Sequence, residues 1–214
     1  MQTRKSPSPS VEAIRRATSE FHLTVNDEQI LQIQQYIEIL LRWNEKMNLT
    51  AIRDPLEILY RHFCESMYGA VAIPVETCRL ADVGTGGGFP GLPLKIVRPG
   101  IEAFLIESNV KKATFLTEVV RELGLTGVRV LVSRYEELSE EVAPLDVICS
   151  RAVGEFGPFL KWASSPILST QKVALWIGAQ DADSVRRLGT WDWQELRQIP
   201  HSLRRFILVG SPTR

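Results

Sequence analysis

A glycine-rich stretch near the middle of the chain has the residue types and spacing of a nucleoside-binding turn. The run from Asp82 to Gly91 follows an apolar segment that predicts a strand at Leu80–Val83. The glycines whose backbone we expect at the ligand, because a Cβ there would clash with it, are Gly84, Gly86 and Gly88. The next predicted strand, Ala103–Glu107, ends in a carboxylate that can accept hydrogen bonds from both ribose hydroxyls. The loop and Glu107 therefore predict one pocket at the carboxyl ends of two strands.

The same loop also satisfies the dinucleotide fingerprint G-x-G-x-x-G, so a NAD-dependent oxidoreductase is an alternative interpretation. Pro90 and Pro93 weigh against it, because they crowd the turn that should open a pyrophosphate-binding helix. The chain also has no room for a separate substrate domain. Arg134–Glu137 follows the third predicted strand. These residues either contact an adenine or form a capping turn that begins at Ser133. A nucleoside-binding module without catalysis is a further alternative.

Short apolar runs alternate with helical stretches from Arg79 onward, and this texture is typical of a doubly wound, mostly parallel α/β sheet. The remaining segments that we expect in this part are strands at Val128–Val132, Leu145–Ser150 and Val173–Ile177, helices at Val110–Leu123 and Gln180–Thr190, and a closing hairpin near Glu195–Ile199 and Arg205–Val209. Gly124 is the natural stop of the first of these helices. Residues 77–214 are therefore expected to form one ligand-binding domain of Rossmann-like type.

The N-terminal part predicts a small helical module at residues 11–76, preceded by a disordered tail at residues 1–10. The tail is rich in Ser, Pro and basic residues and lacks apolar periodicity. Apolar residues recur at spacings of three and four between Asn26 and Trp43, which predicts a helix with one apolar face. Asp54-Pro55 supplies a capping side chain and a proline at the first helical position, so a second helix is expected at Leu56–Tyr68.

The charge balance of the chain, with 25 Lys and Arg against 25 Asp and Glu, gives no overall positive field. A basic surface for a nucleic acid must therefore be local. Three cysteines and three histidines show no metal-ligand spacing, so we expect reduced thiols and no metal site. The N-terminus is not apolar enough for a signal sequence, and no later run is long enough to span a bilayer. We expect a soluble cytoplasmic protein without a membrane partner.

Several short motifs follow one another between Leu40 and Val153, about half of the chain. They are Trp43-Asn44, Asn48-Leu49-Thr50, Arg53-Asp54-Pro55, Arg61-His62-Phe63 with Glu65-Ser66, the run from Asp82 to Leu94, Arg98-Pro99 and Ser150-Arg151-Ala152. In this order they resemble a known family, the small-subunit ribosomal RNA guanine 7-methyltransferases, also called glucose-inhibited division protein B.

The resemblance implies a class I methyltransferase fold and methyl transfer from S-adenosylmethionine to nitrogen 7 of a guanosine. The implied partner is 16S ribosomal RNA, free or within the small ribosomal subunit. Carried over position by position, the resemblance places around the cofactor Gly84, Phe89, Tyr135, Glu136 and Arg151, with Glu107 as the ribose acid. The chain departs from the family at Ile177, where a lysine is usual, and this puts a phosphate contact in question.

The segment after the fourth predicted strand bears on the chemistry. Methyltransferases acting on exocyclic amines resemble one another in an Asn- or Asp-Pro-Pro-aromatic motif there, and those acting on pyrimidine carbon in a cysteine after proline. Arg151-Ala152-Val153 stands there instead. Nitrogen 7 of guanine carries a lone pair and no proton, so its methylation needs no general base and positioning should supply most of the rate. We expect Arg151 to orient the cofactor or the guanine carbonyl oxygen; an ion pair with a loop carboxylate such as Glu155 is the alternative.

Candidate contacts to RNA phosphates are Arg53, Arg61 and His62, on or just before the second predicted helix. A solvated charged face is the more common meaning of such residues. Trp191 and Trp193 alternate as in a strand, so they either stack on an unpaired base or, more commonly, pack against the sheet. The sequence names neither the target nucleotide nor the oligomeric state, for which a monomer is our expectation.

Overall fold

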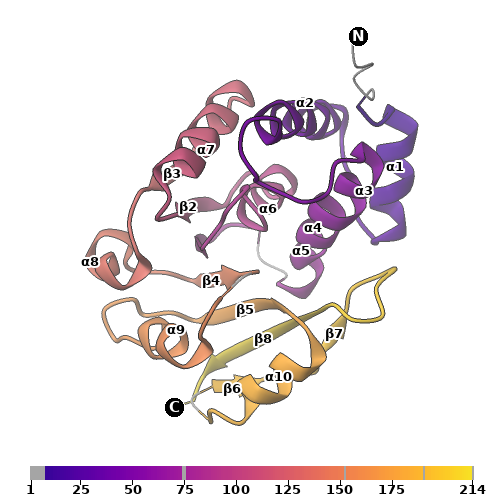
Figure 1. Cartoon of the computed structure of the whole chain (residues 1–214). Coiled ribbons are helices and arrows are strands. Elements are labelled where there is room, and N and C mark those ends of the chain that lie inside the picture. The colour runs from indigo at the N-terminus through magenta and orange to yellow at the C-terminus, as the bar shows by residue number, and fades with distance from the viewer. Residues whose placement is uncertain (1–7, 74–75, 152, 190, 214) are drawn as a thin grey trace.

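A computed structural model of the chain describes residues 8–73, 76–151, 153–189 and 191–213. Figure 1 shows a central sheet with the N-terminal helices above it and the last helices below it. The strands are β1 (Arg79–Val83), β2 (Glu102–Ile106), β3 (Val128–Leu131), β4 (Val147–Ser150), β5 (Lys172–Ile177), β6 (Trp191–Trp193), β7 (Arg197–Gln198) and β8 (Phe206–Pro212). The helices before the sheet are α1 (Val11–Glu20), α2 (Asp27–Asn44), α3 (Pro55–Ile58), η1 (Leu59–Cys64), α4 (Glu65–Met67) and α5 (Gly69–Ala72). The helices that connect the strands are α6 (Gly91–Val97), α7 (Val110–Glu122), η2 (Tyr135–Glu137), α8 (Ser139–Val142), α9 (Phe156–Ala163) and α10 (Ala179–Arg186).

The strands form one sheet over the described residues, in the order β3-β2-β1-β4-β5-β8-β6, with β7 also paired to β8. The first five strands are parallel, whereas β8 runs antiparallel to β5, β6 and β7. This confirms the predicted doubly wound, mostly parallel α/β sheet. The strand order reverses between β1 and β4, and ligands of such sheets bind at the carboxyl ends of the strands beside that point.

Two apolar cores cover the two faces of the sheet. Consecutive strand residues point to opposite faces, so Leu80 joins the core under the N-terminal helices, α6 and α7, while Ala81 joins the core under α8, α9 and α10. The same alternation separates Leu105 from Phe104 and Ile106 on β2. Because parallel strands are buried on both faces, they read in the sequence as continuous apolar runs.

The prediction of one regular helix at Leu56–Tyr68 is wrong. The chain forms the short helix α3, then the π-helix η1, and then α4 and α5. The predicted cap at its start is present, because the Asp54 side chain accepts a hydrogen bond from the Glu57 main-chain N–H at 2.8 Å. Wider π-type turns are often found at functional sites, and η1 contains Arg61 and His62.

The C-terminal segments close the sheet with one strand more than expected. β7 and β8 pair as the predicted hairpin, and β6 pairs with the far end of β8. On β6, Trp191 is buried, and a Cβ added to Gly210 on β8 would lie 2.5 Å from the Trp193 ring. The two tryptophan rings therefore pack on the sheet, as the more common reading of their alternation predicts.

The helical N-terminal part shares its core with the sheet. Asn26 and Gln29 form a capping box at the start of α2, and the Gln29 side chain also donates to the Ile96 carbonyl on α6 at 2.8 Å. Most of the predicted tail lies outside the described residues. Its described end is ordered: Ser8 donates to Glu38, and the Pro9 carbonyl accepts from Gln34 on α2. α2 therefore offers polar partners to the end of the predicted tail.

Candidate active site

Three glycines determine the path of the loop after β1. Gly84, Gly86 and Gly88 have φ angles of 67°, 59° and 89°, in the left-handed region that residues with a Cβ rarely adopt. A Cβ added to Gly84 would meet no heavy atom within 4 Å. The backbone conformation therefore favours glycine at position 84, and the space beside Gly84 is open to a ligand.

A buried carboxylate at the end of β1 holds both ends of this loop. The Asp82 Oδ2 atom accepts hydrogen bonds from the Thr85 hydroxyl at 2.6 Å and from the Gly91 main-chain N–H at 2.8 Å. Asp82 is fully buried, and burial raises its pKa from 3.8 to about 6 despite these two donors. The charge on Asp82 is thus costly, and the loop geometry depends on its oxygen atoms.

Aromatic residues support the loop from below. A Cβ on Gly88 would lie 2.1 Å from the Tyr36 hydroxyl, which itself donates to the Gly87 carbonyl at 2.5 Å. The Phe89 ring stacks on Tyr36 and on His62, with centroid distances of 5.6 and 4.8 Å. The Phe89 side chain is buried in this stack, so the cofactor contact that we expect from Phe89 stays a prediction.

A cavity of about 450 Å³ lies at the carboxyl ends of β1 and β2, and we call it the first hollow. Four of the expected cofactor residues line it, namely Gly84, Glu107, Tyr135 and Glu136. They come from the loop after β1, the end of β2 and the short helix η2. Val153, Glu155 and Pro158, after β4, form the opposite wall. The volume falls in the range of cavities that hold small-molecule cofactors.

Glu107 is fixed in the first hollow by the main chain. Its Oε2 atom accepts from the Gly86 N–H at 3.0 Å, and its Oε1 atom accepts from the Asn109 N–H at 2.8 Å. A carboxylate has about four acceptor positions, so both oxygens can still accept a hydrogen bond from a ligand. Gly86 therefore serves the site by orienting Glu107.

The segment after β3 forms the short helix η2, and the predicted cap at Ser133 is wrong. Arg134 precedes the helix without a side-chain cap, and the Ser133 hydroxyl instead donates to the Glu137 carboxylate at 2.7 Å. Tyr135 and Glu136, between them, line the first hollow, and the Tyr135 ring packs edge-on against Trp162 at 5.0 Å. The hydrogen bond from Ser133 to Glu137 and the ring contact with Trp162 thus hold two candidate ligand contacts in place.

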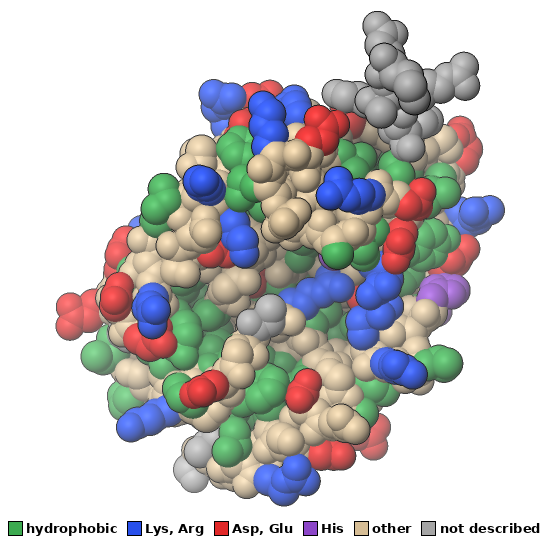
Figure 2. Space-filling view, in the orientation of Figure 1, with side chains coloured by type: hydrophobic (Ala, Val, Ile, Leu, Met, Phe, Trp, Pro, Cys, Tyr) green, Lys and Arg blue, Asp and Glu red, His purple; other side chains and the backbone are tan. Residues whose placement is uncertain are grey.

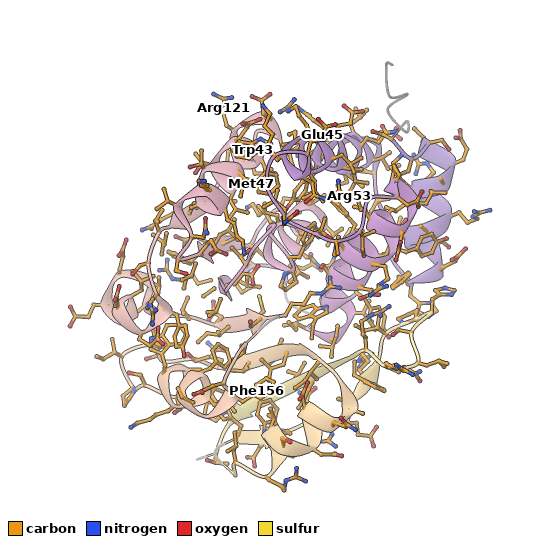
Figure 3. The ribbon with its side chains drawn as sticks, viewed as in Figure 1. Trp43, Glu45, Met47, Arg53, Arg121 and Phe156 are labelled. Carbon is orange, nitrogen blue, oxygen red and sulfur yellow. The ribbon has the colours of Figure 1, made fainter. Side chains whose placement is uncertain are left out.

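A smaller cavity of about 190 Å³, the second hollow, adjoins the first and shares Val153 with it. It lies at the carboxyl ends of β4 and β5, and its wall includes Arg151, Phe156, Trp176 and Asp181. In Figure 3, Phe156 lies in the lower part of the molecule, and Trp43, Met47 and Arg53 lie above it on the helical side. The sequence prediction put Arg151 in the cofactor pocket itself, whereas it lines the neighbouring hollow.

One buried carboxylate beside the second hollow faces three arginines. Glu65 lies 3.2 Å from Arg151, 2.6 Å from Arg205 and 3.8 Å from Arg61, and its carbonyl accepts from Trp176 at 2.7 Å. Arg151 therefore pairs with Glu65, not with Glu155. Figure 2 shows Lys and Arg side chains gathered around the central hollow of this face. Even with Glu57, which also pairs with Arg61, two carboxylates leave the three guanidinium groups with an excess positive charge, which favours an anionic ligand.

The three candidate RNA contacts lie in different surroundings. Arg53 is exposed on the segment before α3. Arg61 is half-buried and reaches both Glu57 and Glu65. His62 is largely covered, its Nε2 atom lies 2.6 Å from the Thr50 hydroxyl, and burial together with the neighbouring Arg151 and Arg61 lowers its pKa to about 3. His62 is therefore neutral at pH 7 and cannot attract phosphates by charge.

Sequence reasoning missed the roles of Glu65, Asp82 and Arg205. Glu65 could have been found from its helical spacing to Arg61, and Asp82 could have been found as an acidic residue inside the apolar run of β1. Neither signal pointed to Arg205, whose partner is 140 positions away.

The three cysteines are buried and unpaired. No group of three or more His, Cys, Asp or Glu side chains among these residues is placed to hold a metal ion. None of the described helices combines the length and the apolar character that crossing a membrane requires.

Comparison with known proteins gives a consistent family. Residues 29–199 match the family described as rRNA small subunit methyltransferase G, GidB. Proteins named ribosomal RNA small subunit methyltransferase G are similar to this chain in Dichelobacter nodosus, at 40% identity over 154 residues, and in Chromobacterium violaceum, at 33% over 190 residues. These matches cover 72% and 89% of this chain and 72% and 85% of the relatives. A relative from Desulfitobacterium hafniense is 38% identical over 152 residues, which cover 70% of this chain and 63% of that protein.

Solved structures support the same fold. An S-adenosylmethionine-dependent methyltransferase from Aquifex aeolicus superposes with a TM-score of 0.58 at 16% identity, covering 81% of this chain and 98% of that one. A mutant of MtNAS in complex with S-adenosylmethionine gives a TM-score of 0.58 at 15% identity, covering 94% and 77%. At such identities the likeness concerns the fold alone.

Proposed function

The chain belongs to the rRNA small subunit methyltransferase G family, and we propose that it transfers a methyl group from S-adenosylmethionine to nitrogen 7 of a guanosine in 16S ribosomal RNA. The observation that carries the proposal is the family match across residues 29–199. We further propose that the protein acts as a monomer in the cytoplasm, where its RNA substrate is made.

The residues of the first hollow fit S-adenosylmethionine. Glu107 keeps free acceptor positions for two ribose hydroxyls, and Gly84 leaves its side of the cavity open. Tyr135 and Glu136 line the same cavity and would contact the adenine. When bound, S-adenosylmethionine supplies an electrophilic methyl group on a positively charged sulfur.

The protein's contribution to methyl transfer is positioning. Nitrogen 7 of guanine has a free lone pair, so no side chain has to remove a proton. Arg151 is held by Glu65 through Nη2, while its buried Nη1 has no hydrogen-bond partner among the described residues. A guanidinium held in this way is pre-organised to donate to the guanine carbonyl oxygen or to the cofactor carboxylate.

Cofactor choice is tested by thermal denaturation. We expect S-adenosylmethionine to raise the melting temperature of the protein and NAD(H) to leave it unchanged, because only a ligand that binds the folded state stabilises it. Glu107→Gln should weaken this stabilisation, with a dissociation constant about 10-fold or more higher, because it loses a charge-assisted contact. A rise with NAD(H) alone would instead favour an oxidoreductase.

The reaction is tested by mass-spectrometric mapping of 16S ribosomal RNA from cells with and without the gene. We expect one 7-methylguanosine to be absent when the gene is deleted and to return with the wild-type gene. An Arg151→Ala gene should restore it poorly. Binding of S-adenosylmethionine together with an unchanged methylation map would favour a nucleoside-binding module without catalysis.

A further inference from the structure

The second hollow contains one charged side chain of each sign. Its lining includes a single cation, Arg151, and a single carboxylate, Asp181, among the described residues. Phe156, Trp176 and Ile177 supply apolar and aromatic surface between them. The cavity is less than half the size of the first hollow and adjoins it at Val153. It therefore suits a planar polar ring held beside the cofactor.

The chemistry of nitrogen 7 limits how a guanine can be recognised there. Arginine usually reads guanine through O6 and N7 together. In this reaction N7 must stay free, because its lone pair attacks the methyl group, so Arg151 can contact only O6. The remaining polar groups of the base, N1–H and the N2 amino group, are both donors. Recognition on that edge therefore requires an acceptor, and a carboxylate supplies two acceptor oxygens.

On this basis, and resting on the function proposed above, we propose that the second hollow is the guanine-binding subsite and that Asp181 accepts hydrogen bonds from the N1–H and N2 amino groups of the target base. Enzymes that act on single bases commonly take the base out of its stack and read its Watson–Crick edge between apolar side chains. Adenine presents an acceptor at N1 and no amino group at C2, so a carboxylate at this position selects against it.

The surroundings of Arg151 and Asp181 suit a contact of Arg151 with O6 and of Asp181 with the donor edge of guanine. Asp181 is exposed in the first turn of α10, and one of its oxygens would lie 3.8 Å from a Cβ on Gly178 at the end of β5. Trp176 is anchored by its hydrogen bond to the Glu65 carbonyl, which fixes that wall. Ile177 also lines the hollow, and no lysine among the described lining residues competes for Asp181.

An acidic residue in the first turn of a helix also stabilises the helix dipole, so the experiment must separate recognition from stability. Three proteins are compared: wild type, Asp181→Asn, and the matched control Asp183→Asn, which changes an exposed aspartate on the same helix outside the hollow. The substrates are 16S ribosomal RNAs assembled by ligation, with guanosine or inosine at the methylated position. Inosine keeps O6, N7 and N1–H but lacks the N2 amino group.

We expect the wild type and Asp183→Asn to methylate the inosine RNA about 10- to 100-fold less efficiently than the guanosine RNA, as kcat/KM, because the Asp181 carboxylate, once covered by the bound base, lacks the N2 donor. Asp181→Asn should lose a similar factor on guanosine and distinguish the two RNAs by less than about 3-fold. Its melting temperature should match that of Asp183→Asn. Equal guanosine-to-inosine ratios in wild type and Asp181→Asn would overturn the assignment of Asp181. Failure of the wild type to methylate the guanosine RNA would overturn the proposed function itself.

Discussion

Replacing Asp82 by asparagine should make the stability of the protein less dependent on pH. Asp82 is the fully buried carboxylate that holds the glycine loop through its Oδ2 atom. An asparagine side-chain oxygen in the same place can accept from Thr85 and Gly91 as well, so the loop geometry should be kept. The substitution removes a charge that folding transfers out of water.

The magnitude follows from the pKa of Asp82. Burial raises it from 3.8 to about 6, a difference of roughly two pH units. Each unit corresponds to about 1.4 kcal/mol, so the total is about 3 kcal/mol. The folded state binds the proton more tightly than the unfolded state. The contribution of Asp82 to stability is therefore complete below pH 3.8 and is lost as the pH rises through about 6.

The assay is urea unfolding of wild type and Asp82→Asn at several pH values between 4 and 8. The asparagine amino group replaces Oδ1, which has no hydrogen-bond partner, and we expect this to cost about 1–3 kcal/mol at every pH. The difference in unfolding free energy between the two proteins should nevertheless change by about 2.5 kcal/mol in favour of asparagine from pH 4 to pH 8, because a small part of the loss precedes pH 4. A difference that does not vary with pH would refute the reasoning. Asp82→Ala, which removes both contacts to the loop, should lower cofactor affinity far more than Asp82→Asn.

Three further substitutions test other parts of the site. Glu65→Ala should destabilise the protein by about 3 kcal/mol in urea unfolding, because it leaves the partly buried arginines without their carboxylate. Gly88→Ala should lower the free energy of unfolding by about 3 kcal/mol or more, since the new methyl group would collide with the Tyr36 hydroxyl. Gly84→Ala should lower it by only about 1 kcal/mol, because the backbone is strained there but the space is free. If Arg53 contacts a phosphate, Arg53→Ala should reduce the slope of log affinity for RNA against log salt concentration by about one. The control is Arg121→Ala, which should leave this slope unchanged. Arg121 lies at the end of α7 (Figure 3) and pairs with Glu122. Equal slopes for both variants would remove Arg53 from the interface.

The sheet and the glycine loop could be predicted from the sequence because their signals are local. A buried parallel strand is a short apolar run, and each predicted parallel strand ends within one residue of its position in the structure. The carboxylate of Glu107 reaches the pocket because β1 and β2 are neighbours in register, with Val83 opposite Ile106. Local pattern and parallel pairing are together sufficient to place that residue.

The irregular helical segment before the sheet could not be predicted in the same way. Leu56–Tyr68 has an apolar pattern that suits a regular helix, and nothing local marks the π-helical turn at Leu59–Cys64. The turn brings Arg61 and Glu65 to arginines on other elements. Such a choice is made by tertiary contacts, which override local propensity.

The arginine cluster explains why the chemistry of the site is less local than its fold. Arg151 follows β4 and Arg205 precedes β8, and the two meet only because β8 inserts antiparallel beside β5, next to β4. Their shared partner, Glu65, lies before the first strand of the sheet. The position of Arg151 therefore depends on three distant segments, and a change in any of them should alter methyl transfer before it alters cofactor binding in the first hollow. This separation predicts that Arg205→Lys, which keeps the charge but loses the paired contacts to Glu65, lowers kcat for 16S ribosomal RNA while leaving the dissociation constant of S-adenosylmethionine within about 3-fold of wild type. A parallel loss of cofactor affinity would show instead that the two hollows act as one site.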